Sequence, residues 1–182
     1  VLIEPFIDIW IGDKYILSKS VLFILIFIYY QQVMRSCYLV FKEGAGIYVE
    51  DRYVPVIESF TNIIFSILFV KYFGLFGVFL GTLLSNLILW IYSYPKFVYH
   101  LIFKRSYIDY AKETIFLILI FLFTMIVSYT LSFYINLDNK YLLFIIKTII
   151  AIIIPNIILF IVYRKTDEFK YYLNLTKKIL NI

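Results

Sequence analysis

Residues 115–135, IFLILIFLFTMIVSYTLSFYI, form an apolar run that contains no charged side chain. A helix rises 1.5 Å per residue, so about 20 such residues cross the roughly 30 Å hydrocarbon core of a bilayer. Three further stretches are mainly apolar and of similar length: Val54–Val70, Leu75–Trp90 and Tyr141–Tyr163. The sequence therefore predicts a chain that crosses a membrane several times.

A fifth apolar stretch begins at Val21–Tyr30 and then becomes more polar. It contains Gln31, Gln32 and Arg35 before it ends at Phe41. Because polar side chains are costly against lipid, we expect this helix to face other protein or a wet cavity. The predicted spans are Lys19–Val40, Pro55–Val70, Leu75–Tyr94, Thr114–Ile135 and Tyr141–Tyr163.

These spans predict an all-α fold, a polytopic transmembrane helical bundle that occupies residues 1–182 as a single domain. Residues Val1–Gly12 resemble the apolar end of a preceding span closed by an interfacial tryptophan. We therefore expect the chain to be a fragment of a longer protein, with five spans plus the end of a sixth.

The composition excludes several classes of protein. Apolar residues make up 63% of the chain, too many for a water-facing surface. Cys37 and His100 are the only cysteine and histidine, so we expect no disulfide, no metal site and no cofactor. The sequence contains no HExxH, GxSxG or P-loop motif, which favours a protein that is not an enzyme.

Basic residues predict the topology. The net charge of +5 would suit nucleic acid, but in a membrane protein it more often reflects orientation and lipid contact, so we expect no nucleic acid partner. Lysine and arginine are enriched in alternate connections, which predicts a cytoplasmic C-terminus. Residues 166–182 are expected to form a cytoplasmic amphipathic tail, with apolar positions such as Phe169, Leu173 and Leu180 and three lysines.

Several polar positions within the spans have two interpretations. Arg35 and Glu58 are expected near the same end of an antiparallel helix pair, where they either form an ion pair or interact separately with the interface and the helix dipole. Glu58, Asn62 and Ser66 are spaced i, i+4, i+8 and so share one helix face. That face either lines a hydrophilic path or bonds to neighbouring helices.

Two other spans have distinctive patterns. Gly77, Gly81 and Ser85 repeat every four residues, which indicates close helix packing. Lys147 either extends toward the interface or projects into an anion-attracting cavity. Pro155 is expected to kink the last span, as a hinge or as a fixed bend.

An ordered set of short motifs resembles the bacterial polysaccharide-biosynthesis flippases of the multidrug/oligosaccharidyl-lipid/polysaccharide superfamily. The motifs run from residue 1 to about 95: Pro5-Phe6-Ile7, Trp10-Ile11-Gly12, Gly46, Asp51-Arg52-Tyr53, Pro55, Glu58 with Asn62 and Ser66, Gly74-Leu75, Gly77-Val78, Gly81-Thr82 and Tyr94-Pro95. Residues 104–182 match only in hydropathy. The resemblance implies a fold similar to multidrug and toxin extrusion transporters, of which this chain would supply most of the C-terminal half.

The resemblance also implies a substrate, an undecaprenyl-diphosphate-linked oligosaccharide moved across the bacterial cytoplasmic membrane. Its partners would be that substrate, membrane lipids and the missing N-terminal half of the same protein. Arg35, then Lys147, would contact the anionic head group. Gln31, Gln32 and Asn62 would bond to sugar hydroxyls, and Glu58 would titrate in a coupled cycle. The alternatives are a drug or other lipid exporter on the same fold and, less favoured, a membrane-embedded glycan polymerase or acyltransferase.

Overall fold

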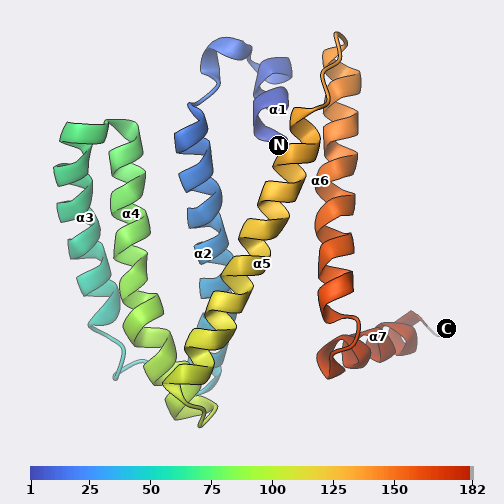
Figure 1. Ribbon diagram of the computed structural model, residues 1–182. Helices are drawn as coiled ribbons and strands as arrows, with labels where there is room; N and C mark the ends of the chain where they lie inside the picture. The colour runs from blue at the N-terminus through green and yellow to red at the C-terminus, as the bar shows by residue number, and fades with distance from the viewer. Residues whose placement is uncertain (181–182) are drawn as a thin grey trace. The chain divides into compact units, whose positions relative to one another are not determined.

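The computed structural model describes residues 1–180, and within that range the chain forms helices and no strands (Figure 1). The elements are α1 (Ile3–Trp10), the short 3-10 helix η1 (Asp13–Tyr15), α2 (Lys19–Gly44), α3 (Val54–Phe73), α4 (Leu75–Ile88), the π-helix η2 (Leu89–Ile102), α5 (Tyr107–Phe133), α6 (Lys140–Tyr163) and α7 (Asp167–Leu180). The predicted all-α helical fold is confirmed.

Five of these helical segments are long and apolar enough to cross a membrane: α2, α3, α4 with η2, α5 and α6. Each predicted span lies on one of them, and some of the helices extend several residues beyond the predicted spans. The third segment continues to Ile102 instead of stopping at Tyr94, and the fourth begins at Tyr107 instead of Thr114. Helical hydrogen bonding satisfies the backbone beyond the apolar run, so hydropathy alone does not locate helix ends.

Local sequence explains where the helices begin. Pro55 occupies the first turn of α3, where its missing N–H has no helical partner to lose. Ser106 and Asp109 form a reciprocal cap at the start of α5, since each backbone N–H donates to the other residue's side chain at 3.1–3.2 Å. At the start of α6, the Asn139 side chain accepts from the backbone N–H groups of Tyr141 and Leu142.

The chain divides into two compact units. The first, here called the hairpin unit, is Leu17–Phe116 and contains α2, α3, α4, η2 and the start of α5. The second, here called the terminal unit, joins Val1–Ile16 to Leu117–Ile182 and contains α1, η1, the rest of α5, α6 and α7.

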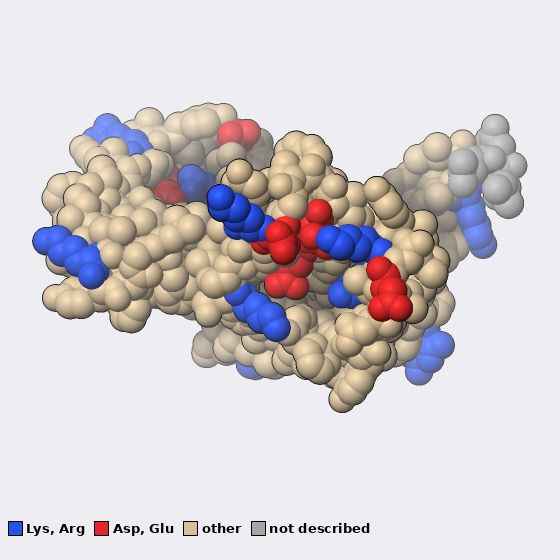
Figure 2. All heavy atoms as spheres, turned by 90° about the horizontal axis from the view of Figure 1, so that it is seen from above, with Lys and Arg blue, Asp and Glu red and all other residues tan. Residues whose placement is uncertain are grey.

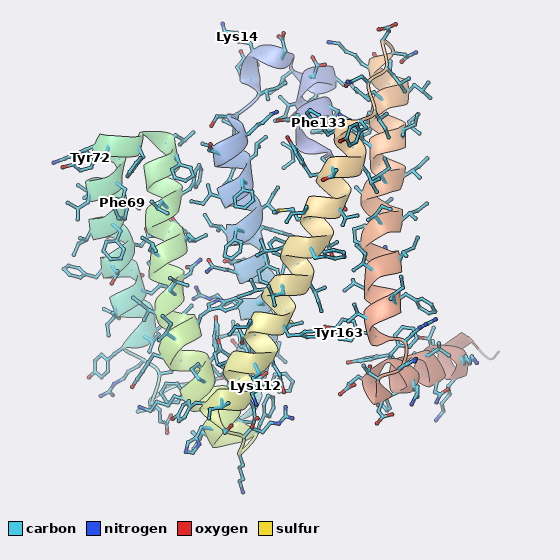
Figure 3. The ribbon with its side chains drawn as sticks, in the orientation of Figure 1. Lys14, Phe69, Tyr72, Lys112, Phe133 and Tyr163 are labelled. Carbon is cyan, nitrogen blue, oxygen red and sulfur yellow. The ribbon has the colours of Figure 1, made fainter. Side chains whose placement is uncertain are left out.

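The tightest packing in the hairpin unit is between α3 and α4, which lie side by side and antiparallel in Figure 1. Gly74 connects them in a conformation with positive φ that favours glycine. A Cβ on Gly77 would lie 2.2 Å from the Phe69 carbonyl oxygen, and one on Gly81 would lie 2.6 Å from the Ser66 nitrogen. The glycines predicted to allow close packing therefore do so. In Figure 3, Phe69 and Tyr72 mark the far end of α3, and Lys112 lies at the opposite end of this unit.

In the terminal unit, α1 packs against the start of α6. The rings of Phe6 and Phe144 are 6.3 Å apart, and Lys140 donates to Asp8 at 2.8 Å. Figure 2 looks onto the end where α6 begins, and acidic and basic side chains lie next to one another there. Helix α7 spans most of the predicted amphipathic tail; residues 181–182 lie outside the described range.

Candidate functional site

Arg35 on α2 and Glu58 on α3 form an ion pair within the hairpin unit. The Arg35 Nη1 atom lies 2.6 Å from Glu58 Oε1, and the two side chains are 34% and 12% exposed. Because α2 and α3 are antiparallel, the last third of α2 and the first turns of α3 lie at the same end of the hairpin unit, and the Arg35 side chain reaches Glu58 there. Of the two interpretations left open by the sequence, the pair is therefore the one that the structure shows.

The polar face of α3 bonds to α4. Asn62 donates from Nδ2 to the hydroxyl oxygens of Thr82 and Ser85, both at 3.1 Å, and Ser66 donates to the Val78 carbonyl at 3.3 Å. Ser85 is fully buried. These contacts favour the interpretation in which Asn62 and Ser66 link neighbouring helices over the one in which they line a path.

The remaining residues singled out from the sequence have different surroundings. Gln31 is buried and accepts a hydrogen bond from Asn86 of α4 at 3.1 Å, whereas Gln32 on the same helix is exposed. Lys147 is half-buried on α6 and belongs to the terminal unit. The hairpin unit thus brings together Arg35 and Glu58 but does not contain Lys147.

A second charged cluster lies near the first and was missed by sequence reasoning. Lys42, at the end of α2, forms an ion pair with Asp51 of the following loop. It also donates to the Ser93 hydroxyl at 3.2 Å, and Ser93 in turn donates to Asp51 at 2.9 Å. All three residues are at most 6% exposed. In the sequence, Lys42 and Asp51 lie on either side of a turn that contains Gly46. The lysine contributed only to the predicted topology, and the aspartate only to the set of motifs.

A cavity of about 190 Å³ lies between the two charged clusters, and we call it the charged cavity. Its lining comes from α2, the 45–53 loop, the start of α3, and η2: Arg35, Leu39, Lys42, Glu43, Ile47, Tyr48, Asp51, Arg52, Pro55, Leu89 and Tyr94. Arg52 stacks on the neighbouring Tyr53 ring at 4.7 Å. The lining therefore combines basic, acidic and aromatic side chains.

Tyr94, which lines the cavity, belongs to a cluster of packed tyrosines. Tyr38 of α2 stacks on Tyr94 of η2 with ring centroids 4.4 Å apart, and the rings of Tyr99 and Tyr110, which contact each other, each lie 6.3 Å from the Tyr38 ring. Tyr99 donates to Glu113 at 2.5 Å. Tyr94 is only 2% exposed, and its hydroxyl has no hydrogen-bond partner among residues 1–180. This packing fixes η2 against α2 and the first turns of α5.

One of these tyrosines forms a hydrogen bond to the backbone of the π-helix η2. In a π-helix the carbonyl of residue i accepts from the N–H of residue i+5, as Val98 does from Phe103 at 2.9 Å. Trp90 would accept from residue 95, which is a proline without an N–H. The Tyr110 hydroxyl donates to the Trp90 carbonyl at 2.7 Å instead. The carbonyl of the buried Trp90, which cannot bond to Pro95, is thus satisfied from α5.

The chemistry available at this site is charge pairing and hydrogen bonding. Among the described residues, no group of three or more histidine, cysteine, aspartate or glutamate side chains is placed to hold a metal ion. We compared the chain with protein-family models, with curated proteins and with solved structures. None of these comparisons found a match. The function of this chain is therefore inferred from the sequence pattern and from the geometry of this site.

Proposed function

We propose that this chain is part of a bacterial flippase that moves undecaprenyl-diphosphate-linked oligosaccharide repeat units across the cytoplasmic membrane during the synthesis of surface polysaccharides such as O-antigen or capsule. The ordered motifs and the five membrane-length helices support the class of protein. The observation that carries the proposal is Arg35, a cation on a membrane-length helix that lines a cavity and is paired with a carboxylate. Ionisable residues in such helices generally mark a substrate or ion pathway.

The ion pair suggests how an anionic head group would enter the cycle. Arg35 is one-third exposed and has N–H groups beyond the one bonded to Glu58, so a diphosphate could approach it from the cavity. Arginine–phosphate bonds are charge-assisted and often bidentate, and they would compete with the bond to Glu58. A Glu58 carboxylate released in this way would be free to bind another cation.

The other residues receive narrower roles in this proposal. Among the three amides Gln31, Gln32 and Asn62, Gln32 is the exposed one and is therefore the best placed to bond to sugar hydroxyls. Gln31 and Asn62 bond to α4, which favours a role in holding α2 and α3 on α4. Lys147 remains a second candidate contact for the head group, from the terminal unit.

We further propose that the protein resides in the inner membrane with its C-terminus in the cytoplasm. The support is the excess of lysine and arginine in alternate connections, which cells retain on the cytoplasmic side. In this orientation the charged cavity and the 45–53 loop would face the cytoplasm, the side on which lipid-linked repeat units are made available.

Glycan export in a deletion strain tests the proposal. Cells that lack the full-length gene are complemented with the intact protein, and both surface polysaccharide and lipid-linked repeat units trapped on the cytoplasmic side are measured. We expect trapped units that clear only on complementation. Normal export without the protein would contradict the proposal and would favour drug or other lipid transport.

A pair of variants then tests the role of Arg35. The Arg35→Gln variant is expected to lower export at least tenfold, because a neutral amide cannot replace the charge-assisted bonds. The matched control is Arg164→Gln, which removes an exposed arginine beyond the end of α6 and should export at the parental rate. Equal export by both variants would remove Arg35 from the site.

A further inference from the structure

Helix α7 is amphipathic and most of its apolar face is uncovered. One face carries Tyr172, Leu175 and Ile179, which are 64%, 40% and 72% exposed, together with Phe169 and Leu173. The opposite face carries Lys170, Asn174, Lys177 and Lys178. The described part of the terminal unit thus leaves an apolar stripe open along the helix, and exposed stripes of this kind mark interaction surfaces.

The position of α7 is fixed by the helix before it. Only three residues separate α7 from the end of α6, a membrane-length apolar helix. The Thr166 hydroxyl caps α7 by accepting from the Phe169 N–H at 3.3 Å, and the Phe169 ring contacts Phe160 of α6 with centroids 5.7 Å apart. In Figure 1, α7 turns away from the axis of α6 and runs across its end. A helix that begins where a spanning helix ends lies at the membrane surface, whichever way α6 runs.

The charges on and just before α7 indicate which kind of surface this helix binds. The segment from Arg164 to Lys178 contains five basic and two acidic residues, and the acidic pair, Asp167 and Glu168, occupies the first turn of α7. Lys170 is paired with Asp167 at 3.0 Å, while Lys177 and Lys178 lie at the C-terminal end, with no ion pair within the described residues. The exposed lysines thus lie beside an apolar face, an arrangement that suits anionic lipid head groups above acyl chains.

We infer that α7 docks flat onto a leaflet that contains anionic phospholipid, with its Leu175 and Ile179 side chains among the acyl chains and its lysines at the head groups. This inference is independent of the transport proposal, since it concerns only the surface on which the protein is held. Each lysine near an anionic surface favours the docked state by roughly fivefold, so the three lysines together favour it by roughly a hundredfold.

Spin labels on the full-length protein test the inference. In a background where the other cysteines, including Cys37, are replaced by serine, single labels are placed on the apolar face (Ile179→Cys) and on the polar face (Asn174→Cys). The protein is reconstituted in nanodiscs of phosphatidylcholine, alone or mixed with phosphatidylglycerol. The accessibility of each label to oxygen, which partitions into acyl chains, and to a water-soluble nickel chelate is then measured.

We expect the Ile179 label in anionic nanodiscs to be accessible to oxygen and protected from nickel, and the Asn174 label to show the reverse. Combined replacement of Lys170, Lys177 and Lys178 by glutamine should shift the docking equilibrium roughly a hundredfold toward the undocked state. The matched control replaces three lysines elsewhere, Lys14, Lys71 and Lys104, and should leave docking unchanged.

Three results would overturn the inference. An Ile179 label open to nickel in anionic nanodiscs would show that the apolar face does not enter lipid. A label protected from both reagents would show that protein covers this face. Docking that is equal in the two lipid compositions and unaffected by the three substitutions on α7 would show that anionic lipid is not what the helix binds.

Discussion

The close approach of α3 and α4 predicts that adding a single methyl group at Gly81 will destabilise the protein. The new Cβ would lie 2.6 Å from the backbone nitrogen of Ser66 and 2.8 Å from its Cα. These are backbone atoms that no rotamer change can move, so the helices would have to separate by roughly 1 Å to restore ordinary carbon contacts. Such a separation would also stretch the bond from Ser66 to the Val78 carbonyl, now 3.3 Å long.

The expected loss of stability follows from these two effects. Overpacking a close interface costs about 1–3 kcal/mol, and an interhelical hydrogen bond in a membrane protein contributes about 0.6 kcal/mol. We therefore expect Gly81→Ala to lower the free energy of unfolding by about 2–4 kcal/mol. Gly77→Ala, whose Cβ would meet the Phe69 carbonyl oxygen at 2.2 Å, should behave in the same way.

Gly44 supplies the matched control for this experiment. It is the last residue of α2, and a Cβ there would meet no atom within 4 Å. Gly44→Ala should leave stability unchanged or raise it by up to about 1 kcal/mol, because alanine favours the helix. The assay is unfolding of the full-length protein in mixed detergent micelles, followed by circular dichroism. Equal stability of the Gly81 and Gly44 variants would refute the close packing of α3 on α4.

Three further predictions concern the site and are measured by the same unfolding assay. Lys42→Met leaves the buried Asp51 carboxylate without its ion-pair partner and should lower the free energy of unfolding by about 3 kcal/mol. A change near zero would mean that the pair is exposed to water. In a double-mutant cycle, Arg35→Gln and Glu58→Gln should show a coupling of about 1 kcal/mol, reduced from the fully buried value because the arginine is one-third exposed, and simple additivity would argue against the ion pair. Tyr110→Phe should cost about 1–2 kcal/mol, because it removes the donor to the Trp90 carbonyl, while Tyr94→Phe should be close to neutral; equal effects would contradict the proposed role of the Tyr110 hydroxyl.

The sequence predicted the spans well because membrane crossing depends on local composition. The apolar run at 115–135 has to be helical in a bilayer, whatever it packs against. Helix ends depend on contacts that are distant in the sequence. The predicted span ends at Tyr94, before Pro95, yet the helix continues past the proline, and the Tyr110 hydroxyl donates to the Trp90 carbonyl that the proline has no N–H to serve.

The site was predictable where helix geometry alone brings residues together. Arg35 and Glu58 were recognised as a possible pair because consecutive helices in a short hairpin are antiparallel. Ser93 was not, because it lies 42 residues from Asp51 and 51 from Lys42, and no local pattern indicates that it is buried between them. The burial of Lys42 was also missed, because a lysine at a helix end is usually solvated.

Reconstitution of the purified full-length protein in proteoliposomes tests the central claim most directly. A lipid-linked oligosaccharide with a diphosphate bridge is incorporated in both leaflets, and a membrane-impermeant enzyme that modifies the sugar reports the fraction that reaches the outer leaflet. We predict that the protein makes the inner-leaflet fraction accessible, and that Arg35→Gln greatly slows this movement. A rate no higher than that of protein-free liposomes would contradict the proposed function.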